Sequence, residues 1–448
     1  MSGRASPARR VAAEVLAAVR EDDAYANLLL PARIAQARLS PADAGLATEL
    51  TYGTLRMQGR YDRIIALAAG RDVAAIDLPV LDVLRLGVHQ LLATRIPPHA
   101  AVGDTVALAP RRATGFVNGV LRAVARTTPE EWDARVGEGL DGDARIAAET
   151  SHPSWVIGVL REALAADGRD GELGDLLAAD NIPPAVSLVA LPGIAEVAEV
   201  GEPGGVSPTA ARAPGGDPAA VPAVAAGRAR VQDEGSQLAA LVLSRAREIR
   251  PGERWLDLCA GPGGKAALLA AEARLGGAEL TANELVPARA GLVRKALAVL
   301  DPAPEVVVGD GARFGQTHPG GFDRILLDAP CTGLGALRRR PEARWRKQQA
   351  DVPELVALQE RLLDAAVAAL APGGLLAYVT CSPHPAETRA VVAGALDRHP
   401  GLVALDTRAV AAGVATSDLG PGTGPALQLW PHRHGTDAMF IQLLTREA

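Results

Sequence analysis

The chain has 448 residues, of which 48% are hydrophobic and 22% are charged. This length predicts two or three domains, and the composition is that of a folded protein rather than a disordered one. The formal net charge of -6 excludes a uniformly basic nucleic-acid-binding protein, although binding through a local basic patch needs no positive total. No run of about 18 apolar residues occurs, which excludes a membrane-spanning helix and indicates a cytoplasmic protein.

The first third of the chain has helical periodicity. Ser6 and Pro7 form a good helix start, because serine is a favoured N-cap and proline is favoured in the first turn. Further helices are predicted over residues 42–55, 61–69, 81–93, 105–109 and 115–125, and the pair Pro97-Pro98 interrupts them once. Residues 1–138 are therefore predicted to form an all-α helical domain.

The periodicity weakens between residues 139 and 230. A helix is predicted over residues 154–165 and a strand over residues 185–191. Residues 201–228 are crowded with Gly, Pro and Ala, which predicts an irregular segment. We expect a small middle domain with a linker.

From residue 231 to residue 448 strands and helices alternate. The predicted strands cover residues 254–259, 279–283, 305–308, 322–327, 375–380 and 439–444. The predicted helices cover residues 265–275, 287–299, 354–370 and 387–398. This alternation predicts a Rossmann-like α/β domain, a parallel sheet with helices on both faces. Because such sheets bind ligands beyond the carboxyl ends of their strands, the site is expected in the loops after those strands.

A glycine-rich loop follows the first of these strands. It consists of Cys259, Ala260, Gly261, Pro262, Gly263, Gly264 and Lys265. Such a loop lets the backbone approach a ligand, although a structural turn is about as common, and it fits neither the dinucleotide motif nor the P-loop. Acidic residues end or follow the next three strands: Glu284 suits ribose hydroxyls, Asp310 suits an adenine amino group, and Asp328 ends the fourth strand. Together these signals favour an adenosine-containing cofactor without a pyrophosphate, namely S-adenosylmethionine.

The three cysteines, Cys259, Cys331 and Cys381, cannot form a closed disulfide set and fit no zinc spacing. Taken singly, each is typical of a small buried apolar residue. Cys331 follows Asp328-Ala329-Pro330, however, and Cys381 follows Thr380 at the end of another predicted strand. Methylation of cytosine at carbon 5 needs a thiolate that adds to carbon 6, an acidic group near ring nitrogen 3, and an unstacked base. These two loops supply the thiol and the acid, whereas an amino-group methyltransferase would need no cysteine.

Several longer segments carry a family resemblance. They are CAGPGGK at 259–265, FDRILLDAPCTGLG at 322–335, VTCSPHPAET at 379–388 and LWPHRHGTDAMF at 429–440. With VQDEGSQLAALVL at 231–243, they resemble the RNA cytosine-5 methyltransferase family (Sun/NOL/NOP). ELTYGTLR at 49–56 and GFVNGVLR at 115–122 resemble the NusB-like RNA-binding domain found in the branch of that family that acts on 16S ribosomal RNA.

The resemblance assigns roles to individual positions. It implies that Cys381 is the nucleophile, that Cys331 assists product release and that Asp328 contacts the base. It places the loop 259–265 in the S-adenosylmethionine site, and it also places there Glu284, Asp310, Asp328 and, more weakly, Arg289. DNA cytosine methyltransferases instead use the cysteine of their Pro-Cys motif as nucleophile, so sequence alone allows the two roles to be exchanged. Gly261 and Glu284 stand where many relatives have alanine and aspartate, and both preserve the needed chemistry.

A basic cluster follows the Pro-Cys loop. It contains Arg338, Arg339, Arg340, Arg344, Arg346 and Lys347, with Trp345 among them. Charge runs are usually solvated faces, but the position of this one predicts contacts with RNA phosphates, and Trp345 is expected either to stack on a base or to anchor the loop. A second patch is expected from Arg111, Arg112, Arg122 and Arg126, and the histidines are expected to have structural roles.

The function predicted from the sequence is therefore methylation of carbon 5 of a cytosine in 16S ribosomal RNA through a covalent cysteine adduct. Two alternatives stay open: methylation of another RNA such as transfer RNA, and a catalytically degenerate RNA-binding assembly factor. The presence of Cys331, Cys381 and Asp328 counts against the second. A monomer without a metal or a membrane partner is expected.

Overall fold

The computed structural model describes residues 5–22 and 24–447. Contacts divide the chain into two units, each described here by itself. Unit 1 comprises Met1–Gly158, Leu177–Ile182 and Leu337–Arg346, and unit 2 comprises Val159–Leu176, Pro183–Ala336 and Lys347–Ala448. The domain boundaries expected at residues 138 and 230 stay predictions. Among the described residues, no helix is both long enough and apolar enough to cross a membrane.

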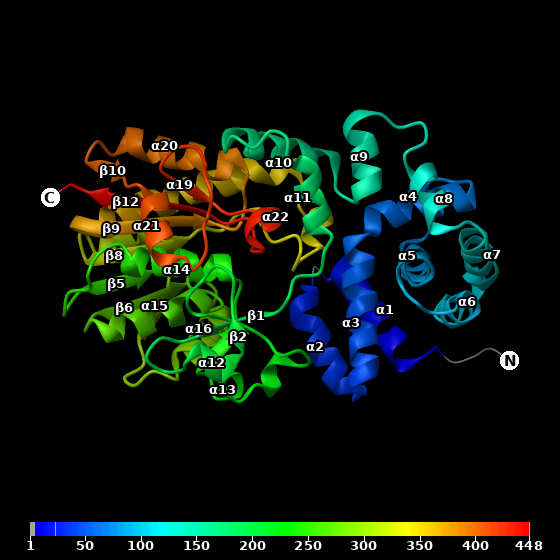
Figure 1. The fold of residues 1–448 in the computed structure, drawn as a ribbon, viewed down its shortest axis with the longest axis horizontal. Coiled ribbons are helices and arrows are strands. Elements are labelled where there is room, and N and C mark those ends of the chain that lie inside the picture. The colour runs from blue at the N-terminus through cyan, green and yellow to red at the C-terminus, as the bar shows by residue number, and fades with distance from the viewer. Residues whose placement is uncertain (1–4, 23, 448) are drawn as a thin grey trace. The chain divides into compact units, whose positions relative to one another are not determined.

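Unit 1 is built from helices, as predicted (Figure 1). They are α1 (Pro7–Glu21), α2 (Ala26–Ala37), α3 (Pro41–Arg56), α4 (Gln58–Ala69), α5 (Leu78–Ala93), α6 (Pro98–Val106), α7 (Thr114–Ala125), α8 (Pro129–Val136) and α9 (Gly142–Thr150). The next two helices, α10 (Ser154–Ala166) and α11 (Leu173–Asp180), contribute residues to both units. Short 3-10 turns lie at η1 (Val73–Ala75) and η2 (Arg111–Ala113).

The helix starts follow local rules with one difference from the prediction. α1 begins at Pro7, but the Ser6 side chain makes no cap hydrogen bond and instead accepts from Arg9. The interruption predicted at Pro97-Pro98 is confirmed, because α5 ends at Ala93 and α6 begins at Pro98, where proline lacks only an N–H that the first turn leaves unpaired anyway. The helix predicted over residues 105–109 is thus the end of α6, shifted toward the N-terminus.

Unit 2 contains a small antiparallel sheet of order β2-β3-β1-β4. Its strands are β1 (Ser187–Ala190), β2 (Glu202–Pro203), β3 (Ala210–Arg212) and β4 (Ala229–Val231), accompanied by α12 (Val197–Val200), η3 (Pro218–Ala220) and α13 (Pro222–Ala225). The predicted strand at 185–191 is confirmed by β1, but the irregular segment predicted over 201–228 is wrong. Strands of two or three residues are too short to show alternation in a sequence rich in Gly and Pro.

The large sheet of unit 2 has the order β10-β12-β9-β8-β5-β6-β7, with β11 paired to β12. Its strands are β5 (Arg254–Asp257), β6 (Glu279–Glu284), β7 (Glu305–Val308), β8 (Phe322–Asp328), β9 (Leu370–Thr380), β10 (Leu402–Ala404), β11 (Leu427–Gln428) and β12 (Phe440–Arg446). The neighbours from β9 to β7 pair in parallel, as predicted, whereas β12 runs antiparallel to β9 and to β10. The sheet is therefore mixed, which corrects the all-parallel prediction.

Helices cover both faces of this sheet (Figure 1). One face is packed by α14 (Glu234–Arg245), α15 (Gly264–Leu275), α16 (Pro287–Leu297) and α21 (Thr407–Val414), and the other by α17 (Phe314–Thr317), α19 (Val352–Ala369) and α20 (Arg389–Arg398). The remaining short elements are η4 (Gly311–Arg313), α18 (Ala343–Arg346), η5 (Gln349–Asp351), η6 (Pro385–Glu387) and α22 (Pro431–His434).

Alternation along the strands supplies both hydrophobic cores. In β8, Leu326 joins the core with α14 and α15, whereas Ile325 and Leu327 join the core with α19 and α20. With both faces buried, the carboxyl edge is the place where side chains from several strands converge. β5, β6, β8 and β9 end there in Asp257, Glu284, Asp328 and Thr380.

Candidate active site

The two predicted reactive cysteines meet at the carboxyl edge. β8 and β9 are parallel neighbours with Asp328 opposite Val379, so the loops that follow them start side by side. Cys331 lies in the first loop and Cys381 directly follows β9, and their Sγ atoms are 3.6 Å apart. Both side chains are half-buried, and neither forms a disulfide bond.

A buried carboxylate, Glu387, ties these loops together. It accepts hydrogen bonds from the Thr332 backbone N–H at 2.7 Å and from the Ser382 hydroxyl at 2.6 Å, and the Thr332 hydroxyl also donates to it. The Gln359 amide donates both to Glu387 at 3.2 Å and to the Pro330 carbonyl at 2.8 Å. Because Glu387 is fully buried, each of these charge-assisted bonds acts in a low local dielectric. The spacing of the cysteines therefore has a defined structural support, which the sequence reasoning missed.

The thiol of Cys331 has a strongly perturbed acidity. Its pKa is raised well above the usual value, first by the hydrogen bond with Cys381 and then by burial and by the charges of Cys381, Glu387 and Asp328. The two thiols therefore titrate as a pair, and ionisation of Cys381 disfavours ionisation of Cys331.

Lys265 links the glycine-rich loop to the cysteine loops. Its Nζ atom lies 2.8 Å from the Asp328 carboxylate. Burial alone would lower the pKa of Lys265, but the charge and hydrogen bond of Asp328 raise it above its usual value, and the charge of Cys381 acts in the same direction. The ammonium is thus retained where it stabilises negative charge on both groups.

The glycine-rich loop is held against Glu284. The Gly261 N–H donates to Glu284 at 3.0 Å, and the Arg289 guanidinium donates to the Gly261 carbonyl at 2.7 Å. A Cβ atom at Gly261 would lie 2.1 Å from the Glu284 carboxylate, so a larger residue there requires this side chain to shift. Gly263 has a φ of +104°, and a Cβ atom there would lie 2.7 Å from Ala296 of α16, which makes glycine the residue that fits at this position.

Several buried polar atoms around this loop lack a hydrogen-bond partner of good geometry among the described residues. Asp257 is 1% exposed, and neither carboxyl oxygen has a hydrogen-bond partner of good geometry among the described residues, although the Cys259 backbone N–H lowers its pKa slightly. Burial, aided by the charge of Asp328, raises the pKa of Asp257 to about 8. Both amide atoms of Gln232, which lies against Gly264, are likewise buried without partners in the described part of the chain. Such orphaned groups fit a polar ligand that would complete their hydrogen bonds.

Asp257 and Gln232 were missed from the sequence. Asp257 ends β5 just as Glu284 ends β6 and Asp328 ends β8, so the rule about strand ends was sufficient to find it. The predicted Asp310 is exposed and accepts from the Ala312 N–H at 3.0 Å, and its other oxygen lies 3.9 Å from the Arg313 guanidinium.

Cys259, the first residue of the glycine-rich loop, packs against the core with α19. Burial raises the pKa of its thiol, which suits a packing role. Among the described residues, no group of three or more His, Cys, Asp or Glu side chains has a metal-ligating arrangement.

Arg344, predicted to contact RNA, is instead a structural centre of unit 1. Its guanidinium is fully buried and donates to the carbonyls of Arg56, Ser151 and Asp180, at 3.1, 3.1 and 2.7 Å. These carbonyls belong to the C-terminal ends of α3, α9 and α11, where helices leave carbonyls unpaired and carry partial negative charge. Burial lowers the pKa of Arg344 to about 10. The predicted phosphate contact is therefore wrong for this residue.

The neighbours of Arg344 are also packed into the protein. Arg338 is buried, and Arg339, Arg340, Trp345 and Arg346 are half-buried. The Trp345 indole N–H donates to the Leu55 carbonyl at 3.3 Å, and Arg346 donates to the Ala24 carbonyl at 2.7 Å. Trp345 thus anchors its segment. By contrast, the second predicted patch is exposed at all four positions, Arg111, Arg112, Arg122 and Arg126.

Comparison with known proteins identifies the family. Residues 245–445 match the family described as 16S rRNA methyltransferase RsmB/F, and residues 6–126 match the NusB family. A ribosomal RNA small subunit methyltransferase B of Pseudomonas putida is 36% identical over 89% of this chain and 91% of its own length. The chain belongs to the RsmB/F methyltransferase family.

Other comparisons agree with this membership. A Mycobacterium tuberculosis protein that bears a methyltransferase name is 50% identical over 98% of this chain and 96% of its own length. The crystal structure of PH0851 covers 100% of both chains with a TM-score of 0.78 and 22% identity, which supports the fold. As a member of the RsmB/F family, the protein is an S-adenosylmethionine-dependent RNA methyltransferase, and the predicted NusB-like helical region is confirmed.

Proposed function

We propose that the protein methylates carbon 5 of a cytosine in 16S ribosomal RNA through a covalent adduct with Cys381. The observation that carries this proposal is the pair of thiols 3.6 Å apart beside the Asp328–Lys265 ion pair. Methyl transfer to a nitrogen or a hydroxyl would need neither cysteine. Attack at carbon 5 needs one thiolate to activate the ring and a second group to accept the carbon 5 proton.

We take the roles of the two cysteines from the family resemblance and from their mutual contact. The Cys381 thiolate adds to carbon 6, and the hydrogen bond and charge of Cys381 raise the pKa of Cys331, so that Cys331 is a thiol while Cys381 is a thiolate. Asp328, paired with Lys265, faces the ring and stabilises the adduct. S-adenosylmethionine supplies an electrophilic methyl group, which carbon 5 then attacks.

Product release uses the change in charge at Cys381. Once Cys381 is bound to carbon 6 as a thioether, it no longer carries the charge that raises the pKa of Cys331. Cys331 then gives its proton to solvent more readily, and its thiolate accepts the carbon 5 proton. The electron pair of that C–H bond forms the 5,6 double bond as Cys381 departs as a thiolate. The same coupling thus keeps Cys331 passive during attack and active during elimination.

We assign each polar group of the cofactor to a carboxylate of the site that can accept its hydrogen bonds. We place the ribose hydroxyls at Glu284, the adenine amino group at Asp310, and the methionine ammonium at Asp257, whose carboxyl oxygens lack partners in the described residues. Arg289 holds the loop at Gly261 rather than reaching the ligand directly.

Ribosomal RNA is supported as the substrate by the relatives named small subunit methyltransferase B, at 36% identity for Pseudomonas putida and 32% for Erwinia tasmaniensis. For phosphate contacts we propose the exposed arginines of the turn before α7 and of its C-terminal end, which are Arg111, Arg112, Arg122 and Arg126.

The test is incubation of the purified protein with labelled S-adenosylmethionine and undermethylated 16S ribosomal RNA, with transfer RNA as a parallel substrate. Digested nucleosides would be identified by mass spectrometry. We expect 5-methylcytidine in 16S ribosomal RNA only. Label in transfer RNA alone would overturn the substrate, a different methylated nucleoside would overturn the chemistry, and no label in either RNA would favour an RNA-binding assembly factor.

A further inference from the structure

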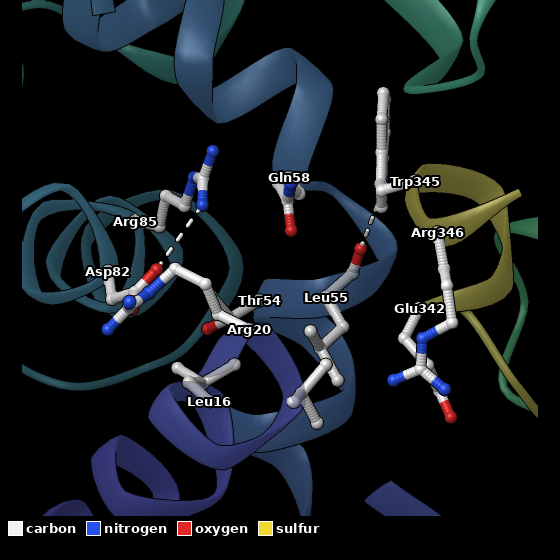
Figure 2. Close-up of a pocket in the computed structure, with 11 residues that line it drawn as sticks. Leu16, Arg20, Thr54, Leu55, Gln58, Asp82, Arg85, Glu342, Trp345 and Arg346 are labelled. Carbon is white, nitrogen blue, oxygen red and sulfur yellow. Dashed lines mark hydrogen bonds and ion pairs between the residues drawn. The ribbon is translucent and has the colours of Figure 1, made fainter. Parts of the chain in front are cut away.

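Unit 1 contains a cavity of about 270 Å³ that the proposed reaction does not use (Figure 2). One wall is the indole of Trp345, seen edge-on in Figure 2 with a face turned toward Gln58. The ring is fixed at one end by its hydrogen bond to the Leu55 carbonyl, and at its edge a Cβ on Gly59 would lie 2.3 Å from the indole. Leu16 and Leu55 form an apolar floor. The cavity thus offers a rigid aromatic face above aliphatic side chains.

Thr54, which lines this cavity, does not make the hydrogen bond that the other threonines of α3 make. In α3, Thr48 and Thr51 each donate to the carbonyl four residues earlier, at 2.8 and 2.7 Å. Thr54 is 1% exposed, lines the cavity, and has no hydrogen-bond partner for its hydroxyl among the described residues. Back-bonding of this kind is the usual solution for a threonine inside a helix, so its absence leaves a buried donor and acceptor for a ligand.

Glu342 and Gln58 add two more polar groups to the lining. Glu342 is 3% exposed, and its Oε1 atom accepts weakly from the Ala26 N–H at 3.4 Å. Its Oε2 atom has no partner in the described part of the chain. The side chain of Gln58 points into the cavity in Figure 2. A buried carboxylate oxygen without a donor costs free energy that an N–H of a ligand would recover.

The arginines around the cavity do not make it an anion site. Arg20 donates to Asp82 at 2.6 Å, and Arg85 is bound by Asp82 and, through two hydrogen bonds, by Asp62. Figure 2 shows this group opposite Trp345. Arg346, the third arginine of the lining, donates to the Ala24 carbonyl at 2.7 Å, and its charge acts on Glu342. With a carboxylate beside each of these guanidinium groups, the cavity favours a neutral polar ligand over a phosphate.

We propose that this cavity binds an unstacked guanine base of the substrate RNA. The inference rests on the proposed function for its RNA substrate. Guanine presents adjacent imino and amino N–H donors to a carboxylate such as Glu342, a carbonyl oxygen to the Thr54 hydroxyl or the Gln58 amide, and a ring face to Trp345. Aromatic stacking with hydrogen bonds to base edges is how proteins read single-stranded RNA. The volume lies just below the range of pockets for drug-sized ligands, which suits a single base.

The test measures calorimetric binding of guanosine, adenosine and cytidine monophosphates and of inorganic phosphate to the full chain. Saturating S-adenosylhomocysteine keeps the cofactor site filled throughout. We expect guanosine monophosphate to bind about tenfold more tightly than the other three, as one bidentate base contact provides. Glu342→Gln should weaken guanosine monophosphate about tenfold and abolish its preference over adenosine monophosphate.

Thr54→Val keeps the proposal testable if Glu342→Gln fails to fold, because the Thr54 hydroxyl bonds to no described residue. It should weaken guanosine monophosphate a few-fold at an unchanged Tm, whereas Thr48→Val on the exposed side of α3 should leave binding unchanged. Equal binding of guanosine monophosphate and phosphate, or wild-type affinity in both variants, would overturn the inference. The measurement uses no methyl transfer, so it fails independently of 5-methylcytidine formation.

Discussion

Two buried carboxylates at the same edge of the sheet have opposite surroundings. Glu387, beside the cysteines, accepts hydrogen bonds from Thr332, Ser382 and Gln359. Asp257, beneath the glycine-rich loop, has no well-placed donor among the described residues, and its pKa is raised to about 8. The part of the site to which we assign the chemistry is therefore assembled by the protein alone. The part to which we assign the cofactor keeps groups without partners among the described residues, and we propose that the ligand supplies these partners.

The largest expected effect comes from Lys265, which joins the two parts. Lys265→Met removes the cation that pairs with Asp328 and raises the cost of a thiolate at Cys381. We expect the methylation rate to fall by about 10³-fold, the scale of losing a positioned charged group in an active site. Single-turnover kinetics measures this rate. Lys295→Met, exposed on α16, is the matched control, and a loss below about tenfold would contradict the role of Lys265.

Glu387→Gln tests whether the cysteine loops are preassembled. The amide cannot accept from Thr332 and Ser382 as the carboxylate does, so the loops should separate. We expect kcat to fall about 100-fold while the Kd of S-adenosylhomocysteine stays within about twofold. Glu354→Gln on the exposed start of α19 should change neither value. A matching loss of cofactor affinity would show that the two parts are not separate.

Asp257→Asn should have opposite effects on binding and stability. Loss of the carboxylate is expected to weaken S-adenosylhomocysteine about tenfold, because its ammonium loses an acceptor. The ligand-free protein should gain stability at pH 8, because a buried charge without a partner is removed. Calorimetric titration and denaturant unfolding measure the two effects, and a destabilised variant with unchanged affinity would make Asp257 purely structural.

The pH dependence of stability follows from the same group. The folded pKa of about 8 lies above the ordinary value of 3.8, so between these limits the folded protein holds a proton that the unfolded chain has lost. The contribution of Asp257 to the free energy of unfolding is thus present at low pH and declines as pH rises from about 4 to about 8, by about 1 kcal/mol per pH unit. Unfolding curves across this range should show the decline in the wild type and a flatter profile in Asp257→Asn.

The sequence was informative at most of the strand ends, although Asp257, which ends β5, was missed. The loops with Cys331 and Cys381 were predicted to meet because parallel neighbours end at one edge, and their Sγ atoms are in contact distance. The same logic found Glu284 and Asp328. It failed for Glu387, which follows Cys381 by six residues and looks like a solvated acid in the sequence, because its burial depends on donors from α19 and from both loops.

The sequence also did not predict which charged side chains are buried. Arg344 belongs to a basic run that is typical of a phosphate-binding surface, yet three helix ends converge on its guanidinium. Nothing local encodes the convergence of α3, α9 and α11, since it arises only when distant helices pack. The strand predicted over residues 439–444 is present as β12, but its antiparallel direction was missed, because alternation of apolar residues gives a strand no direction.

The most direct test of the account is a denaturing gel of wild type, Cys331→Ala and Cys381→Ala after incubation with labelled 16S ribosomal RNA and S-adenosylmethionine. If Cys381 attacks and Cys331 assists elimination, a stable protein–RNA adduct accumulates in Cys331→Ala, and Cys381→Ala forms neither adduct nor 5-methylcytidine. An adduct that accumulates only in Cys381→Ala would exchange the two roles and contradict the account of why Cys331 keeps its proton.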